Sequence, residues 1–219
     1  MIVPENIENI IFDYDGVLGD SASFNKYACK QSARVFGIEL TDEVYERCAP
    51  GGATIQDIAS CIMSHHDMPE KSSEFISQKK SYDTQYGELV KLFQGVPEMV
   101  AKLKKNYKLA VNTGTRHILV DTVLKKHDIY DLFNFVIAAE DITKGKPDPE
   151  SYLLACKKFK AEPKKCLVVE DGTSGVISAI NAGCIVVGLT TTLSTDKLLS
   201  LGCHFVINSI DELMAPSEA

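Results

Sequence analysis

Four carboxylates stand in two pairs in this 219-residue sequence, and each pair directly follows an apolar run. Asp13 and Asp15 follow the first run, and Glu170 and Asp171 follow a later one. Asp13, Glu170 and Asp171 could not all ionise close together without a cation, and oxygen ligands of this kind suit Mg²⁺, which often bridges to a phosphate. Of Asp13 and Asp15, one could attack phosphorus while the other transfers the proton. The two pairs therefore predict a Mg²⁺-assisted phosphoryl site.

Two further residues have the chemistry that a phosphate group needs. Thr113 follows the apolar run at 109–112 and can donate to phosphate oxygens together with nearby backbone N–H groups, while Lys146 adds a positive charge. Each motif alone also has a structural interpretation: a helix cap for Thr113, solvated surface for Lys146, and a turn or a helix N-terminus for the acidic pairs. Their joint occurrence, each after a predicted strand, favours a phosphate site.

The elements that must position these side chains alternate between strand and helix from about residue 107 onward. Short apolar runs predict strands at Ile7–Phe12, Lys108–Val111, Phe135–Ala138, Cys166–Val169, Ile185–Gly188 and His204–Ile207. Helices are predicted at His117–His127, Thr173–Ala182 and Thr195–Leu201, with another that opens with Asp148 as N-cap and Pro149 in the first turn. This alternation predicts a doubly wound, Rossmann-like α/β domain with a parallel sheet, in which ligands bind at the carboxyl ends of the strands.

The segment between the first strand and residue 108 has a different pattern. Helices are predicted at Ser21–Phe36, Asp42–Cys48, Ile55–His65 and Glu70–Leu92, and no convincing strand interrupts them. The expected organisation is an α/β core domain of residues 1–18 and 94–219, with residues 19–93 inserted as an α-helical cap domain. Gly19 and Gly95, at the two connections, would permit hinge motion.

Composition narrows the class of partner and the compartment. Lys and Arg total 23 against 30 Asp and Glu, a net charge of −7, which argues against nucleic acid or an anionic membrane as partner. The seven cysteines show no regular spacing and are expected to be buried thiols rather than disulfides or zinc ligands. No apolar stretch is long enough to span a bilayer and no signal peptide is evident, so a cytoplasmic protein is expected. Its expected oligomeric state is a monomer or a weak homodimer.

Taken together, the motifs resemble those of the haloacid dehalogenase superfamily, in the branch of phosphoglycolate phosphatase and β-phosphoglucomutase with a helical cap. The resemblance implies that Asp13 forms an aspartyl-phosphate and that Asp15 protonates the leaving group and then activates water. It also implies that Thr113, the Gly114 amide and Lys146 hold the phosphoryl oxygens. The implied Mg²⁺ ligands are Asp13, the Asp15 carbonyl, Asp171 and, directly or through water, Glu170. Dehalogenases of the superfamily lack an acid at the position of Asp15, so dehalogenation is not expected.

The sequence signal is weakest for the residues that select the substrate. Residues 48–54 resemble the cap loop that faces the active site, and the sugar phosphomutases of this branch carry a basic residue there to bind a second phosphate. This sequence has none between Pro50 and Asp57, and the nearest is Arg47. A phosphatase of small phosphorylated metabolites, such as sugar phosphates, phosphoglycolate or nucleotides, is therefore favoured. A β-phosphoglucomutase-like mutase and a non-catalytic binding protein on the same fold are the alternatives.

Overall fold

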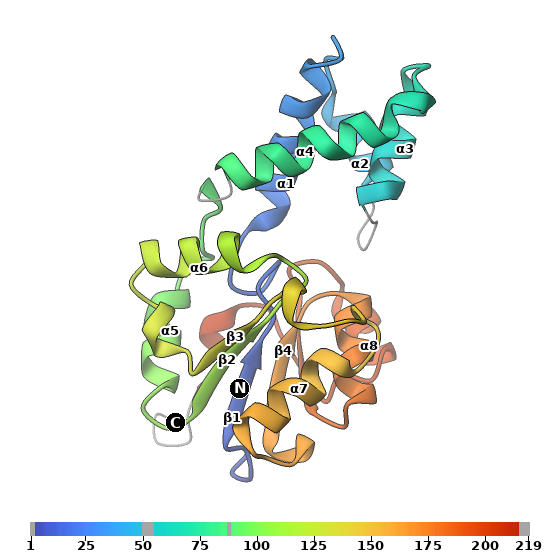
Figure 1. The fold of residues 1–219 in the computed structure, drawn as a ribbon. Helices are drawn as coiled ribbons and strands as arrows, with labels where there is room; N and C mark the ends of the chain where they lie inside the picture. The colour runs from blue at the N-terminus through green and yellow to red at the C-terminus, as the bar shows by residue number, and fades with distance from the viewer. Residues whose placement is uncertain (1–2, 50–54, 87–88, 215–219) are drawn as a thin grey trace. The chain divides into compact units, whose positions relative to one another are not determined.

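The chain forms two compact units in the computed structural model, which describes residues 3–49, 55–86 and 89–214 (Figure 1). One unit combines Met1–Asp20 with Lys91–Ala219, and the other is Ser21–Val90. The second unit is thus inserted into the first, and each is described by itself.

The first unit contains a six-stranded sheet in the order β3-β2-β1-β4-β5-β6, and every neighbouring pair is parallel. The strands are β1 (Asn9–Phe12), β2 (Lys108–Asn112), β3 (Phe135–Ile137), β4 (Cys166–Glu170), β5 (Ile185–Leu189) and β6 (Phe205–Ile207). All residues of β1 and β4 are buried, as expected for strands covered on both faces. The prediction of a doubly wound parallel sheet is confirmed.

Helices cover both faces of this sheet. They are α5 (Val96–Leu103), α6 (His117–Lys126), α7 (Glu150–Phe159), α8 (Thr173–Asn181) and α9 (Thr195–Ser200). Right-handed crossovers place α5 and α6, which lead into β2 and β3, on the face opposite to α7 and α8, which lead into β4 and β5 (Figure 1). The winding direction changes between β1 and β4, so the loops after these two strands meet at the switch point where α/β proteins bind ligands.

The second unit is helical, with α1 (Ser21–Arg34), α2 (Asp42–Cys48), α3 (Ile55–His65) and α4 (Ser72–Tyr86). Its own core includes Ile62, Met63 and Phe75, each without solvent exposure. The helix predicted over Glu70–Leu92 was too long at both ends. A 3₁₀ turn at Pro69–Lys71 precedes α4, and Leu92 instead pairs with Gly19 in an antiparallel bridge.

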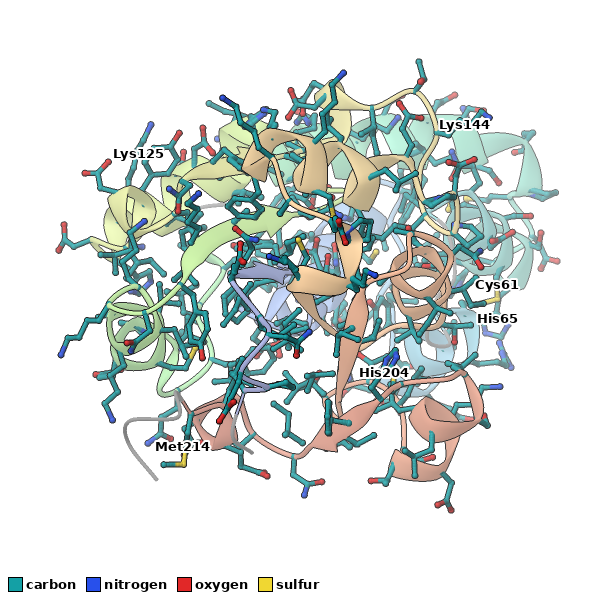
Figure 2. The ribbon with its side chains drawn as sticks, turned by 90° about the horizontal axis from the view of Figure 1, so that it is seen from below. Cys61, His65, Lys125, Lys144, His204 and Met214 are labelled. Atoms are coloured by element: carbon teal, nitrogen blue, oxygen red, sulfur yellow. A yellow bond between two sulfur atoms is a disulfide. The ribbon has the colours of Figure 1, made fainter. Side chains whose placement is uncertain are left out.

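Cys48 and Cys61 form a disulfide, so the expectation of free thiols throughout was wrong. The packing of α2 against α3 brings the Cα atoms of the two cysteines to 5.4 Å from each other, within the range that a disulfide requires. Figure 2 shows Cys61 with its sulfur atom in this unit. Five other cysteines are buried free thiols, as predicted. The expectation of buried thiols therefore holds for these five cysteines and fails for Cys48 and Cys61.

Two local expectations also changed. Pro149 rather than Asp148 is the N-cap of α7, and Asp148 accepts from the Glu150 N–H at 3.0 Å instead. The helix α5 was not predicted; Gly95 precedes it with φ of 85°, a conformation that favours glycine.

Among the described helices, none combines the length and hydropathy needed to cross a bilayer.

Candidate active site

The turn after β1 places two carboxylates at the edge of the sheet. The Asp13 N–H still donates to the Val169 carbonyl at 3.0 Å, so Asp13 is anchored to β4 as well as to β1. The chain then turns at Gly16, where φ is +82°. A Cβ at this position would lie 2.0 Å from Oδ2 of Asp171, so only glycine allows the turn to approach the second acidic pair this closely.

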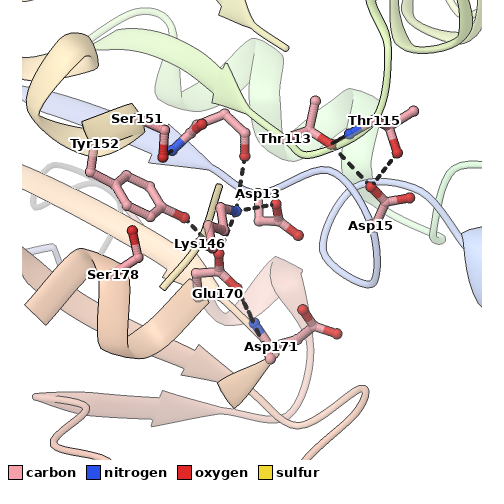
Figure 3. A network of polar contacts seen from close by, with 12 residues as sticks. Asp13, Asp15, Thr113, Thr115, Lys146, Ser151, Tyr152, Glu170, Asp171 and Ser178 are labelled. Atoms are coloured by element: carbon pink, nitrogen blue, oxygen red, sulfur yellow. Dashed lines mark hydrogen bonds and ion pairs between the residues drawn. The ribbon is translucent and has the colours of Figure 1, made fainter. Parts of the chain in front are cut away.

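Lys146 joins the two acidic pairs (Figure 3). Its Nζ lies 2.6 Å from Oδ1 of Asp13 and 2.7 Å from Oε1 of Glu170, and it donates to the Asn112 carbonyl at 3.2 Å. Burial lowers the pKa of Lys146, but the two carboxylates outweigh it and raise that pKa well above its ordinary value. The amine therefore stays charged inside the site.

Glu170 has both carboxylate oxygens occupied by hydrogen-bond donors. Oε1 accepts from Lys146 and from the Tyr152 hydroxyl at 2.6 Å, while Oε2 accepts from the backbone N–H groups of Asp171 and Gly172 at 3.2 and 3.4 Å. Gly175 makes room for it, because a Cβ there would lie 1.8 Å from Oε1. Glu170 is thus buried and held by four donors.

Asp15 faces a different set of partners. Its Oδ2 accepts from the hydroxyls of Thr113 at 3.0 Å and Thr115 at 2.8 Å, both from the loop after β2 (Figure 3). The Thr115 N–H donates to the Thr113 hydroxyl oxygen at 2.9 Å, which fixes that oxygen in turn. The second carboxylate of the turn therefore points toward the predicted phosphate-binding hydroxyl, whereas Asp13 points toward Lys146.

Asp13, Glu170 and Asp171 each offer one oxygen to a group whose members lie within 4.8 Å of one another. Burial, with Lys146 opposing it, raises the pKa of Asp13 well above its ordinary value, and burial followed by repulsion from Glu170 raises the pKa of Asp171 to about 6. Three hard oxygen donors whose charged forms are mutually unfavourable fit a small divalent cation such as Mg²⁺.

The structure therefore brings Asp13, Asp15, Thr113, Lys146, Glu170 and Asp171 together, with Gly114 between the two threonines that bind Asp15. Sequence reasoning missed Thr115, Tyr152 and the threonines at 191 and 192, which contact these residues. Thr191 and Thr192 come shortly after the predicted strand Ile185–Gly188, in a run of three threonines that begins at Thr190. This hydroxyl run at the same sheet edge was a signal that could have found them.

The chain is similar to several known proteins. A model of the haloacid dehalogenase-like hydrolase family matches residues 10–189. A phosphoglycolate phosphatase of Vibrio vulnificus is 31% identical over 218 residues, which cover 96% of each chain. A phosphorylated carbohydrates phosphatase of Thermotoga maritima is 29% identical over 198 residues, 88% of this chain and 90% of that one.

A solved structure from Thermotoga maritima, provisionally described as a β-phosphoglucomutase, is 29% identical. It superposes with a TM-score of 0.78 and covers 94% of this chain and 96% of its own. The family model spans most of the chain and includes each residue of the buried acidic group. This protein therefore belongs to the haloacid dehalogenase-like hydrolase family.

Proposed function

We propose that this protein is a Mg²⁺-dependent phosphatase that hydrolyses a small phosphate monoester through an aspartyl-phosphate on Asp13. The observation that carries the proposal is the placement of Asp15. Its carboxylate lies two residues after the nucleophile and is bound by Thr113 and Thr115. An ester oxygen that leaves as an alcohol needs a proton donor at such a position, whereas a halide does not.

The residues support a reaction in two transfers. An oxygen of Asp13 attacks phosphorus, and the bond from phosphorus to the ester oxygen breaks as protonated Asp15 gives that oxygen its proton. Asp15, now a carboxylate, then takes a proton from water as the water oxygen attacks phosphorus. The bond to Asp13 breaks and inorganic phosphate leaves, with the proton back on Asp15.

Positive charge must offset the repulsion between the Asp13 carboxylate and an anionic phosphate. Lys146 already touches Asp13, at 2.6 Å, and all three of its N–H donors lie in the site. Asp13, Asp171 and the Asp15 carbonyl would hold Mg²⁺, which when bound supplies further positive charge against the phosphate. Because four donors already occupy Glu170, we assign it to hold Lys146 and to reach the ion only through water.

The relatives support a substrate class for this proposal. Phosphoglycolate and phosphorylated carbohydrates are the substrates named for two of them, so we propose a small phosphorylated metabolite of the sugar phosphate, phosphoglycolate or nucleotide type. A sugar phosphomutase is the second candidate, because one structural relative carries that description. Most of the loop that bears on this choice, residues 50–54, lies outside the described residues. Arg47, its nearest basic residue, pairs with His65 Nδ1 at 2.8 Å.

A phosphate-release assay over a panel of phosphate esters, with Mg²⁺ and with EDTA, tests the proposal. We expect release that requires Mg²⁺ and that falls by about 10³-fold or more in Asp13→Asn. Asp131→Asn, an exposed carboxylate of the same unit, is the matched control and should keep its activity. Unchanged release from Asp13→Asn would contradict the mechanism. A sugar 1-phosphate assay with a bisphosphate primer separates the candidates, because an isomerised product identifies a mutase and free phosphate alone identifies a phosphatase.

A further inference from the structure

The loop after β5 reaches the candidate site with two consecutive hydroxyl groups. Oγ1 of Thr192 donates a short hydrogen bond to Oδ2 of Asp171, and Oγ1 of Thr191 donates to the Gly16 carbonyl at 2.6 Å. The Thr191 oxygen also lies 3.4 Å from Oδ2 of Asp171. One loop therefore contacts both of the segments that carry the buried acidic group, the turn after β1 and the acidic pair after β4.

The two groups that these hydroxyls contact, the Gly16 turn and the Asp171 carboxylate, are already packed against each other. Gly16 approaches Asp171 so closely that a Cβ would lie 2.0 Å from its carboxylate oxygen, so the turn and the carboxylate must shift together. Asp171 is only 5% exposed, which limits the water that could replace a lost hydroxyl. A carboxylate oxygen can accept more than one partner, so a hydrogen bond to Oδ2 orients Asp171 without preventing it from binding an ion.

We propose that Thr192 is a positioning residue for Asp171, and Thr191 for the Gly16 turn, so that the loop after β5 sets the affinity of the site for Mg²⁺. This inference rests on the Mg²⁺ site of the proposed function. Hydrogen-bond partners of a metal ligand fix the rotamer of that ligand, and their removal typically lowers metal affinity by about 10- to 100-fold. We expect a loss of about the same size here.

The test is a metal-binding measurement that needs no substrate. Binding of Mn²⁺ is followed by electron paramagnetic resonance, and Mg²⁺ by its competition, in the full chain. Thr192→Val removes the hydroxyl and keeps the shape of the side chain, and we expect it to weaken Mg²⁺ binding by about 10-fold or more. Thr192→Ser restores the hydroxyl and should bind within about 3-fold of the unmodified protein.

Thr190→Val is the matched control from the same run. The Thr190 hydroxyl pairs with Asn208 Oδ1 at 3.1 Å rather than with the acidic group, so its removal should change Mg²⁺ affinity by less than about 2-fold. Unfolding midpoints in EDTA check that every variant is folded, and Thr192→Ala repeats the test should the valine variant be destabilised. An unchanged affinity in both Thr192→Val and Thr192→Ala, or an equal loss in Thr190→Val, would overturn the inference.

Its failure can be told apart from failure of the proposed function. If the protein binds Mg²⁺, loses affinity on Thr192→Val and releases no phosphate from any ester, the positioning role stands and the phosphatase proposal does not. If phosphate is released in a Mg²⁺-dependent way and Thr192→Val binds the ion normally, only the positioning role is wrong.

Discussion

The Tyr152 hydroxyl donates a 2.6 Å hydrogen bond to Oε1 of Glu170, and both residues are buried, with exposures of 0% and 2%. The same oxygen accepts from Lys146, whose Nζ lies 5.1 Å from the centre of the Tyr152 ring. The tyrosine thus supports the Lys146–Glu170 pair with its hydroxyl and with its ring. Burial, together with repulsion from the Glu170 charge, raises the pKa of Tyr152 well above its ordinary value, so its hydroxyl keeps the proton that it donates.

Removal of this hydroxyl should destabilise the α/β unit. Tyr152→Phe keeps the ring but leaves a buried carboxylate short of one donor, and we expect a loss of about 1.5–3 kcal/mol in the free energy of unfolding, measured with urea in EDTA. Tyr107→Phe, at another buried tyrosine of the same unit, should cost less than about 1 kcal/mol. Equal losses in the two variants would show that the hydroxyl of Tyr152 has no special role.

Loss of the Thr115 hydroxyl should slow the reaction more than it weakens substrate binding. Thr115→Val removes one of the two hydroxyl donors to Asp15, and we expect kcat to fall by about 10-fold while KM changes by less than about 3-fold. Thr122→Val, whose hydroxyl donates to the Ile118 carbonyl on α6, is the control and should leave both parameters unchanged.

Magnesium should stabilise the protein through Asp171. A ligand that binds only the folded state at 100 times its Kd adds about 2.7 kcal/mol, so Mg²⁺ should raise the unfolding midpoint and EDTA should reverse the change. Asp171→Asn should remove most of this effect, while Asp131→Asn, an exposed carboxylate, should preserve it. A Mg²⁺-induced shift of full size in Asp171→Asn would exclude this residue as a ligand.

The stability of the α/β unit should depend on pH through His117. Its Nε2 lies 2.8 Å from Asp141 Oδ2 and its Nδ1 lies 3.5 Å from Asp121 Oδ1. Burial lowers the pKa of His117, but the bonds to these carboxylates outweigh it and raise the pKa above the ordinary 6.5. The contribution of the charged imidazole is therefore complete below pH 6.5 and is lost as pH rises through the raised pKa.

Urea unfolding at pH 5.5, about one unit below the ordinary pKa of 6.5, and at pH 8.5, about two units above it, checks this expectation. His117→Gln should remove part of the stability that the protein loses between the two pH values. His127→Gln, which removes an imidazole from the C-terminal end of the same helix, is the control for a general effect of histidine. An unchanged pH dependence in His117→Gln would contradict the assignment.

Reduction of the Cys48–Cys61 disulfide should destabilise the helical unit. The two residues are 13 positions apart, and closing a loop of about this length stabilises a protein by roughly 3 kcal/mol in the chain-entropy model. Dithiothreitol should therefore lower the stability of the unmodified protein and have no effect on the double variant Cys48→Ser/Cys61→Ser. Equal stability with and without the reductant would contradict this expectation.

The sequence alone was sufficient to predict the sheet and the edge of it at which most of the candidate site residues lie. Strands such as Cys166–Glu170 are buried on both faces and appear as continuous apolar runs, and α2 and α3 begin and end where the helical patterns predicted. The site residues Asp13, Thr113 and Glu170 could be placed because parallel strands bring their carboxyl ends to one edge. These features depend on short-range patterns and on one topological rule.

Contacts between distant segments were decided only by the tertiary structure. The strand order sets β1 beside β4, so that Lys146 can reach both Asp13 and Glu170, and the packing of α2 on α3 determines that Cys48 meets Cys61. The hydrogen bonds of Tyr152 to Glu170 and of Thr192 to Asp171 cannot be recognised from a periodic pattern in the sequence, because each joins side chains from separate elements. The sequence determined which chemical groups meet at the sheet edge, whereas packing decided which atom of each group contacts which partner.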